Sequence, residues 1–121
     1  MDVISSRAQL IDYLKFKIGG FSIEQCRVLY LNKKNMLLAD EVIAEDTLDM
    51  VSFHPREIVR KALFHGSSSI IIVHNHPSGD PKASKNDLII TGKIIKACDV
   101  FSISVHDHII VSKNGHFSCF D

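Results

Sequence analysis

Apolar residues recur with two different periods in the first third of the chain, and each period predicts a different element. Residues 6–18 place apolar side chains at helical spacing ahead of two glycines, which predicts a helix with one buried face. Residues 27–31 and 36–43 are largely apolar runs separated by four polar residues that begin and end with asparagine, a composition that suits a tight turn. We therefore expect a helix followed by an antiparallel hairpin.

The rest of the chain alternates between helical and extended patterns. A second helix is expected to begin at His54-Pro55 and to end at Gly66, with His65 on its surface. Its predicted buried stripe consists of Ile58, Val59, Ala62 and Leu63. The other predicted elements are a loop at 45–53, a buried strand at 70–73, a helix from 84 to about 98, a half-buried strand at 100–105, and a hairpin of 108–111 with 116–119. This order predicts an α/β fold in which helices cover a mixed central sheet, a three-layer α/β/α arrangement.

Composition narrows the class of protein. The 121 residues fit a single domain, 1–121, that is large enough to bury one core. The 14 Lys and Arg residues balance the 14 Asp and Glu residues, and this zero formal net charge argues against electrostatic binding of nucleic acid. Cys26, Cys98 and Cys119 are odd in number and far apart, so we expect reduced thiols and a cytoplasmic protein. No secretory signal and no run of ~20 apolar residues is visible, so we expect no membrane association.

One polar stretch, residues 74–87, carries the candidate chemistry. His74 and His76 follow the predicted buried strand two residues apart, so their imidazoles can point the same way in extended chain. Asp87 lies near the start of the next helix, where its carboxylate can fold back toward them. Two histidines and a carboxylate are suitable ligands for a zinc ion that keeps a fourth position open for water. Gly79 permits backbone conformations that other residues resist, and it helps to preorganise the loop.

The neighbouring residues also admit structural explanations. Ser84 and Asp87 have the spacing of a capping box, in which a helix start satisfies its own backbone groups. His106 and His108 would share a strand face and are rival ligands, but no third ligand stands near them in sequence, so packing and hydrogen bonding explain them more simply. Asp107 or His108 could instead orient a zinc ligand by accepting its free ring N–H.

At this point the sequence resembles a known family. The pattern His74-x-His76-Pro77-x-Gly79, followed after four residues by Ser84-x-x-Asp87, is similar to the JAMM signature of the MPN/JAB metallopeptidases. The residues within and around this pattern look most like those of the bacterial RadC-like branch. Flanking residues at 39–42, 54–57 and 107–111 agree with that branch, so the resemblance covers nearly the whole chain. It implies a cytidine-deaminase-like (JAB/MPN) fold and a zinc ion held by His74, His76 and Asp87.

The resemblance also implies catalytic roles. In the family, an upstream glutamate on a strand facing the zinc is the general base, and the resemblance places this role on Glu41. Strand position alone does not separate Glu41 from its acidic neighbours Asp40, Glu45 and Glu57. Zinc would lower the pKa of its water toward ~7 and polarise an amide carbonyl. Glu41 would carry the proton from the water to the leaving amine, and Ser84 would stabilise the oxyanion.

The implied function is zinc-dependent hydrolysis of a peptide or isopeptide bond in a peptide or protein substrate. Two alternatives stay open: a DNA-associated (DNA repair) factor or metal-dependent nuclease, and a non-catalytic MPN binding module. Neutral charge speaks against the first. The complete set of ligands speaks against the second, since a purely structural domain needs no open metal site. The sequence leaves the substrate and the oligomeric state undetermined.

Overall fold

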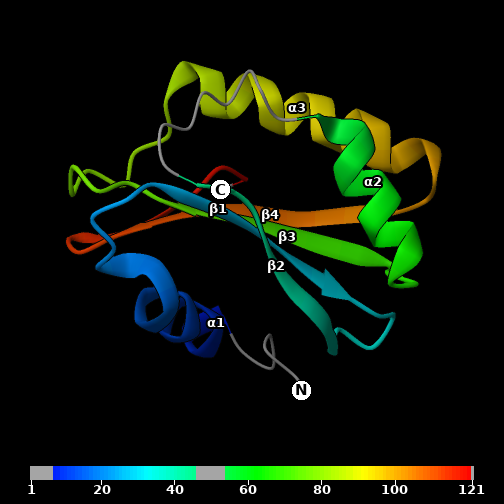
Figure 1. The fold of residues 1–121 in the computed structure, drawn as a ribbon, viewed down its shortest axis with the longest axis horizontal. Helices are drawn as coiled ribbons and strands as arrows, with labels where there is room; N and C mark the ends of the chain where they lie inside the picture. The colour runs from blue at the N-terminus through cyan, green and yellow to red at the C-terminus, as the bar shows by residue number, and fades with distance from the viewer. Residues whose placement is uncertain (1–6, 46–53, 121) are drawn as a thin grey trace.

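The computed structural model describes residues 7–45 and 54–120, which form an α/β fold with helices on both faces of one sheet (Figure 1). The elements are α1 Arg7–Leu14, the π-helical turn η1 Lys15–Gly19, β1 Gln25–Leu31, β2 Leu37–Glu45, α2 Pro55–Phe64, β3 Ser69–Asn75, α3 Lys85–Val100, β4 Ser104–Ser112 and β5 Gly115–Ser118. Residues 46–53 of the predicted loop lie outside the described residues. No helix in the described ranges is long and apolar enough to cross a bilayer.

The strands form one mixed sheet in the order β2-β1-β3-β4-β5. β1 pairs antiparallel with both β2 and β3, β3 pairs parallel with β4, and β4 pairs antiparallel with β5. The helix α3 provides the crossover that the parallel pair requires. Every residue of the central strand β3 is buried, as expected for a strand covered on both faces. The predicted mixed sheet and both predicted hairpins are confirmed.

Two hydrophobic cores lie on opposite faces of this sheet. α2 and α3 cover one face, and α1 covers the other (Figure 1). Ile70 and Ile72 of β3 belong to the core under α2 and α3, whereas Ile71 and Val73 belong to the core above α1. This division follows from the alternation of side chains along a strand. The predicted three-layer α/β/α arrangement is therefore confirmed.

Some local predictions were wrong. The strand predicted at 100–105 is instead the end of α3, a turn in which Ser102 adopts a left-handed φ of 58°, and the start of β4 at Ser104. Leu63 is 51 % exposed, because it lies at the edge of the α2 stripe and turns toward solvent. The first helix is α-helical only to Leu14, and its last turn, η1, has π geometry.

Candidate metal centre

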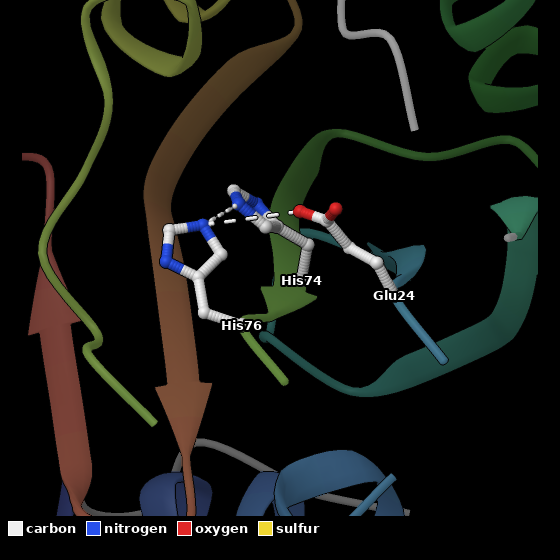
Figure 2. Close-up of side chains that lie close together, drawn as sticks. All are labelled: Glu24, His74 and His76. Atoms are coloured by element: carbon white, nitrogen blue, oxygen red, sulfur yellow. Dashed lines mark hydrogen bonds and ion pairs between the residues drawn. The ribbon is translucent and has the colours of Figure 1, made fainter. Parts of the chain in front are cut away.

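The two histidines of the polar stretch converge at the carboxyl end of β3. His74 is the penultimate residue of β3 and is fully buried, and His76 follows the strand. Asn75 anchors this end of the strand, because its side chain accepts a hydrogen bond from Gln25 N (2.6 Å) and donates one to the Ile23 carbonyl (2.9 Å). The Nε2 atoms of His74 and His76 lie 2.8 Å apart (Figure 2). The structure therefore brings two imidazole nitrogens to one point. The term ligand focus means the space between His74 Nε2, His76 Nε2 and the Asp87 carboxylate.

The carboxylate of Asp87 faces the same focus from the first turn of α3. Its Oδ1 lies 3.5 Å from His74 Nε2, and its Oδ2 lies 3.4 Å from His76 Nε2. Burial by itself would raise the pKa of Asp87, but the two imidazoles and the Ser84 backbone N–H hold that pKa well below its usual range. Asp87 is therefore an ionised carboxylate in contact with both rings.

Ser84 and Asp87 also form the capping box that their spacing predicted. Ser84 Oγ accepts a hydrogen bond from Asp87 N (3.0 Å), and Asp87 Oδ2 accepts one from Ser84 N (2.8 Å). The structural and the functional interpretations of Asp87 thus coexist, since one carboxylate both caps α3 and faces the imidazoles. Ser84 is exposed and uses only a lone pair in the cap. Its hydroxyl hydrogen can still donate to a group bound at the site.

The orientation of the His76 ring tests whether these residues suit a metal. His76 Nδ1 lies 2.9 Å from the Asp80 carbonyl, which can only accept, so Nδ1 carries the hydrogen. The hydrogen bond with Asp87 raises the pKa of His76, and in its neutral form the ring presents the lone pair of Nε2 to the point that it shares with His74 and Asp87. Zinc binds through imidazole nitrogen and carboxylate oxygen, so this set of donors fits a zinc ion. His74, His76 and Asp87 are the residues that could hold it.

The loop after His76 is held in a fixed conformation. Gly79 adopts a φ of 94°, and a Cβ built on it would lie 2.7 Å from the Asn114 side-chain nitrogen. Its N–H donates to the His76 carbonyl (3.0 Å), and its carbonyl accepts from Ser112 Oγ (2.8 Å). The expected need for glycine at position 79 is confirmed, and it ties the His76 loop to the β4–β5 hairpin.

Glu24 is a residue at this site that the sequence analysis missed. Its Oε1 lies 3.9 Å from His76 Nε2, and the three ligand atoms of Glu24, His74 and His76 all lie within 4.8 Å of one another (Figure 2). Burial raises the pKa of Glu24, and the adjacent carboxylate of Asp87 adds to this, although the imidazoles oppose it. The residue stands just before β1, whose Cys26 pairs with His74 across the sheet. No local motif marks it, because only strand pairing brings it to the histidines.

The structure places Glu41 elsewhere. Glu41 lies on β2 opposite Val28 of β1, which in turn lies opposite Ile72 of β3, so it stands two strands away from β3. Its Oε1 is 2.8 Å from His65 Nε2. His65 is therefore not the simple surface residue that we expected: only 19 % of its side chain is exposed, and its ring also packs against Tyr30. The structure thus brings Glu24, and not Glu41, to the imidazoles.

The rival histidines of β4 have different surroundings. His106 is exposed, and its Nε2 lies 3.0 Å from Asn35 Oδ1. His108 is fully buried, and its Nε2 lies 2.7 Å from His74 Nδ1. Asp107 accepts hydrogen bonds from its neighbour's backbone N–H and from Ser118 Oγ. Burial lowers the pKa of His108 to about 3, so this ring is neutral. Both of its nitrogens are in hydrogen-bond contact, one with the candidate ligand His74 and the other with Thr91.

The three cysteines are free thiols, as expected. Cys26 and Cys98 are buried, and Cys119 is partly buried. Burial raises the pKa of Cys98 to about 11 and that of Cys119 to about 12, and it raises the pKa of Cys26 further. Since the thiolate is the nucleophilic form, none of them is an activated nucleophile.

Comparison with known proteins identifies the relatives of this chain. Residues 4–121 match the family described as "RadC-like JAB domain". The chain is also similar to the "UPF0758 protein SPO0054" of Ruegeria pomeroyi (strain ATCC 700808 / DSM 15171 / DSS-3), with 44% identity over 116 residues. The aligned region covers 96% of this chain and 52% of that relative, so the chain spans about half the relative's length.

Proposed function

The chain belongs to the family of RadC-like JAB domains, and from this premise we propose that it is a zinc-dependent hydrolase of the JAMM type that cleaves a peptide or isopeptide bond. The observation that carries the proposal is the convergence of three donors: the Nε2 atoms of His74 and His76, 2.8 Å apart, and the Asp87 carboxylate within 3.5 Å of both. When bound there, zinc would supply a Lewis acid that polarises a carbonyl and acidifies water.

Glu24 takes the role of general base that the resemblance alone assigned to Glu41. Its carboxylate stands 3.9 Å from His76 Nε2, within reach of a water molecule at the focus of the ligands, and 29% of its side chain is exposed. It is therefore able to take a proton from the attacking water and return it to the leaving amine. A positioned acid/base group of this kind contributes about 100-fold to 10,000-fold in rate.

Ser84 donates its hydroxyl hydrogen to the oxyanion that develops on the substrate carbonyl. Its Oγ is held in place by the hydrogen bond from Asp87 N, so the donor is oriented before the substrate binds. Such preorganised donors stabilise the transition state because they need no rearrangement during the reaction.

A peptide or protein is the partner that the chain's charge favours. The formal net charge is zero, whereas a protein that grips the phosphates of DNA or RNA normally carries a basic face. Three free thiols suit a reducing compartment, and we therefore propose that the protein acts in the cytoplasm. The chain spans about half of its relative, so these proposals concern the domain described.

The test compares two isosteric variants, Glu24→Gln and Glu41→Gln, with the wild type. Zinc content is measured by elemental analysis, and hydrolysis is followed on a panel of fluorogenic peptides and isopeptide-linked conjugates, with and without a chelator. We expect about one zinc per chain in all three proteins. Glu24→Gln should lose at least about 100-fold in hydrolysis, whereas Glu41→Gln should keep it, since Glu41 pairs with His65.

Two results would contradict this assignment. Hydrolysis retained by Glu24→Gln and lost in Glu41→Gln would return the base to Glu41. A wild-type protein that binds no zinc after incubation with the metal would refute the enzyme proposal and leave the non-catalytic binding module.

A further inference from the structure

A buried chain of hydrogen bonds runs from a candidate metal ligand back into α3. His74 Nδ1 lies 2.7 Å from His108 Nε2, His108 Nδ1 is in hydrogen-bond contact with Thr91 Oγ1, and Thr91 Oγ1 lies 2.6 Å from the Asp87 carbonyl. His74 and His108 are fully buried, and Thr91 is 4% exposed. The chain therefore begins at the ring of one candidate ligand and ends at the backbone of another, with little access to water.

The number of hydrogens available sets the direction of every bond in this chain. A carbonyl can only accept, so the single hydroxyl hydrogen of Thr91 points at the Asp87 carbonyl. Thr91 Oγ1 can then only accept from His108, which places the hydrogen of that ring on Nδ1. The neutral His108 ring keeps a lone pair on Nε2, and this lone pair accepts the Nδ1–H of His74.

We propose that Thr91 and His108 are positioning residues that hold His74 as the Nδ1–H tautomer, so that the lone pair of its Nε2 points at the metal. The inference rests on the proposed function, in that it takes His74 as a zinc ligand. It extends that function, because neither residue touches the ligand focus itself. Hydrogen bonds of this kind are known to orient metal-bound histidines, and their loss typically lowers metal affinity by about 10-fold to 100-fold.

Replacing Thr91 with Val removes the hydroxyl and keeps the shape of the side chain. The Nδ1–H of His108 would then be buried without an acceptor, so the ring should shift its hydrogen to Nε2. His74 Nδ1 would become the acceptor, and the hydrogen of His74 would move to Nε2, where it blocks the metal. We therefore expect Thr91→Val to bind zinc about 10-fold to 100-fold more weakly. Thr91→Ser keeps the hydroxyl and should bind as the wild type does.

The experiment has two readouts, and neither depends on turnover. Zinc affinity is measured by titrating zinc chloride against a chromophoric chelator, and the histidine tautomers are assigned from long-range ¹H–¹⁵N spectra of the protein with and without zinc. Ser69→Ala is the matched control, because Ser69 is also buried in β3 and its hydroxyl has no hydrogen-bond partner. That variant should leave both readouts unchanged. Thermal unfolding of each variant confirms that it folds.

The expected result is a hydrogen on Nδ1 of both His74 and His108 in the wild type, together with weaker zinc binding in Thr91→Val alone. Unchanged zinc affinity in Thr91→Val, or a hydrogen on Nε2 of His108 in the wild type, would overturn the inference. The tautomer of His108 can be assigned in the metal-free protein. A wild type that binds no zinc but shows both Nδ1–H tautomers would therefore refute the proposed function while supporting the hydrogen-bond chain.

Discussion

Asp87 both caps α3 and faces two imidazoles, and its replacement by Ala should remove both features, whereas replacement of Ser84 by Ala should remove only the cap. Each residue supplies one acceptor of the capping box at the start of α3. Loss of such a cap costs about 0.5–2 kcal/mol in the free energy of unfolding. Without zinc, Ser84→Ala should therefore lose about the value of the cap, and Asp87→Ala should lose more, because it also removes a buried carboxylate whose pKa the two imidazoles lower in the folded state.

Zinc should separate the two variants. A metal present at 100 times its dissociation constant stabilises the folded state by about 2.7 kcal/mol if it binds only that state. Ser84→Ala keeps His74, His76 and Asp87, so zinc should stabilise it as much as the wild type. Asp87→Ala lacks the carboxylate that lies within 3.5 Å of both imidazoles, so it should lose most of that stabilisation.

The measurement is urea denaturation of the wild type and both variants, with chelator and with zinc chloride, alongside the zinc content of each purified protein. The difference in free energy of unfolding between the two conditions reports the bound metal. If Asp87→Ala gained as much stability from zinc as the wild type, Asp87 would be a helix cap only, and the three-ligand site would be refuted.

Two further predictions concern the scaffold. Gly79→Ala should lower the free energy of unfolding by about 1–3 kcal/mol, because alanine is strained at a φ of 94° and its Cβ would lie 2.7 Å from the Asn114 side chain. An unchanged midpoint of urea denaturation would contradict this prediction and show that the loop relaxes freely. Tyr13, whose hydroxyl donates to Asp40 (2.7 Å), has its pKa raised from 10.0 to about 12, chiefly by burial. The folded state thus holds the hydroxyl proton of Tyr13 more tightly than the unfolded state does. The stability that this proton contributes is complete below pH 10 and is lost as the pH rises toward 12. In unfolding experiments between these pH values, Tyr13→Phe should therefore lose less of its free energy of unfolding than the wild type.

Features that depend on a few adjacent residues could be predicted from the sequence. Pro55 occupies the first turn of α2, as its missing N–H favours, and Ser84 caps α3 through Asp87. The spacing of His74 and His76 and the rigid loop at Gly79 were also local properties. In each case the residues involved lie within a few positions of one another, so their spacing in the sequence determines how their side chains are placed relative to one another.

The strand predicted at 100–105 shows where a local pattern misleads. Its alternation of apolar residues and serines fits extended chain, but the segment contains a helix end, a turn and a strand start. Ile103 is buried in the core under α2 and α3, so the apolar position was identified correctly while the conformation was not. Burial and conformation are separate properties, and a short pattern reports mainly the first.

The position of Glu24, the proposed general base, depends on pairing between distant strands. Glu24 and His74 are 50 positions apart in the chain, and they meet because Cys26 pairs with His74 in the antiparallel ladder of β1 and β3. Glu41 lies on the neighbouring strand β2, where the ladder leaves it beside His65. A resemblance that specifies "an upstream glutamate" could not choose between them.

Local sequence was thus enough to predict the candidate ligand triad and the class of fold, because residue spacing, helix caps and strand alternation are short-range properties. Only the tertiary structure decided which glutamate lies beside the two imidazoles and which histidine contacts His74. His108 reaches His74 because β4 lies parallel to β3, with His74 paired to Ile110 in the register of that ladder. Strand order and register are set by the burial of the whole sheet between two layers of helices, and no single segment contains that information.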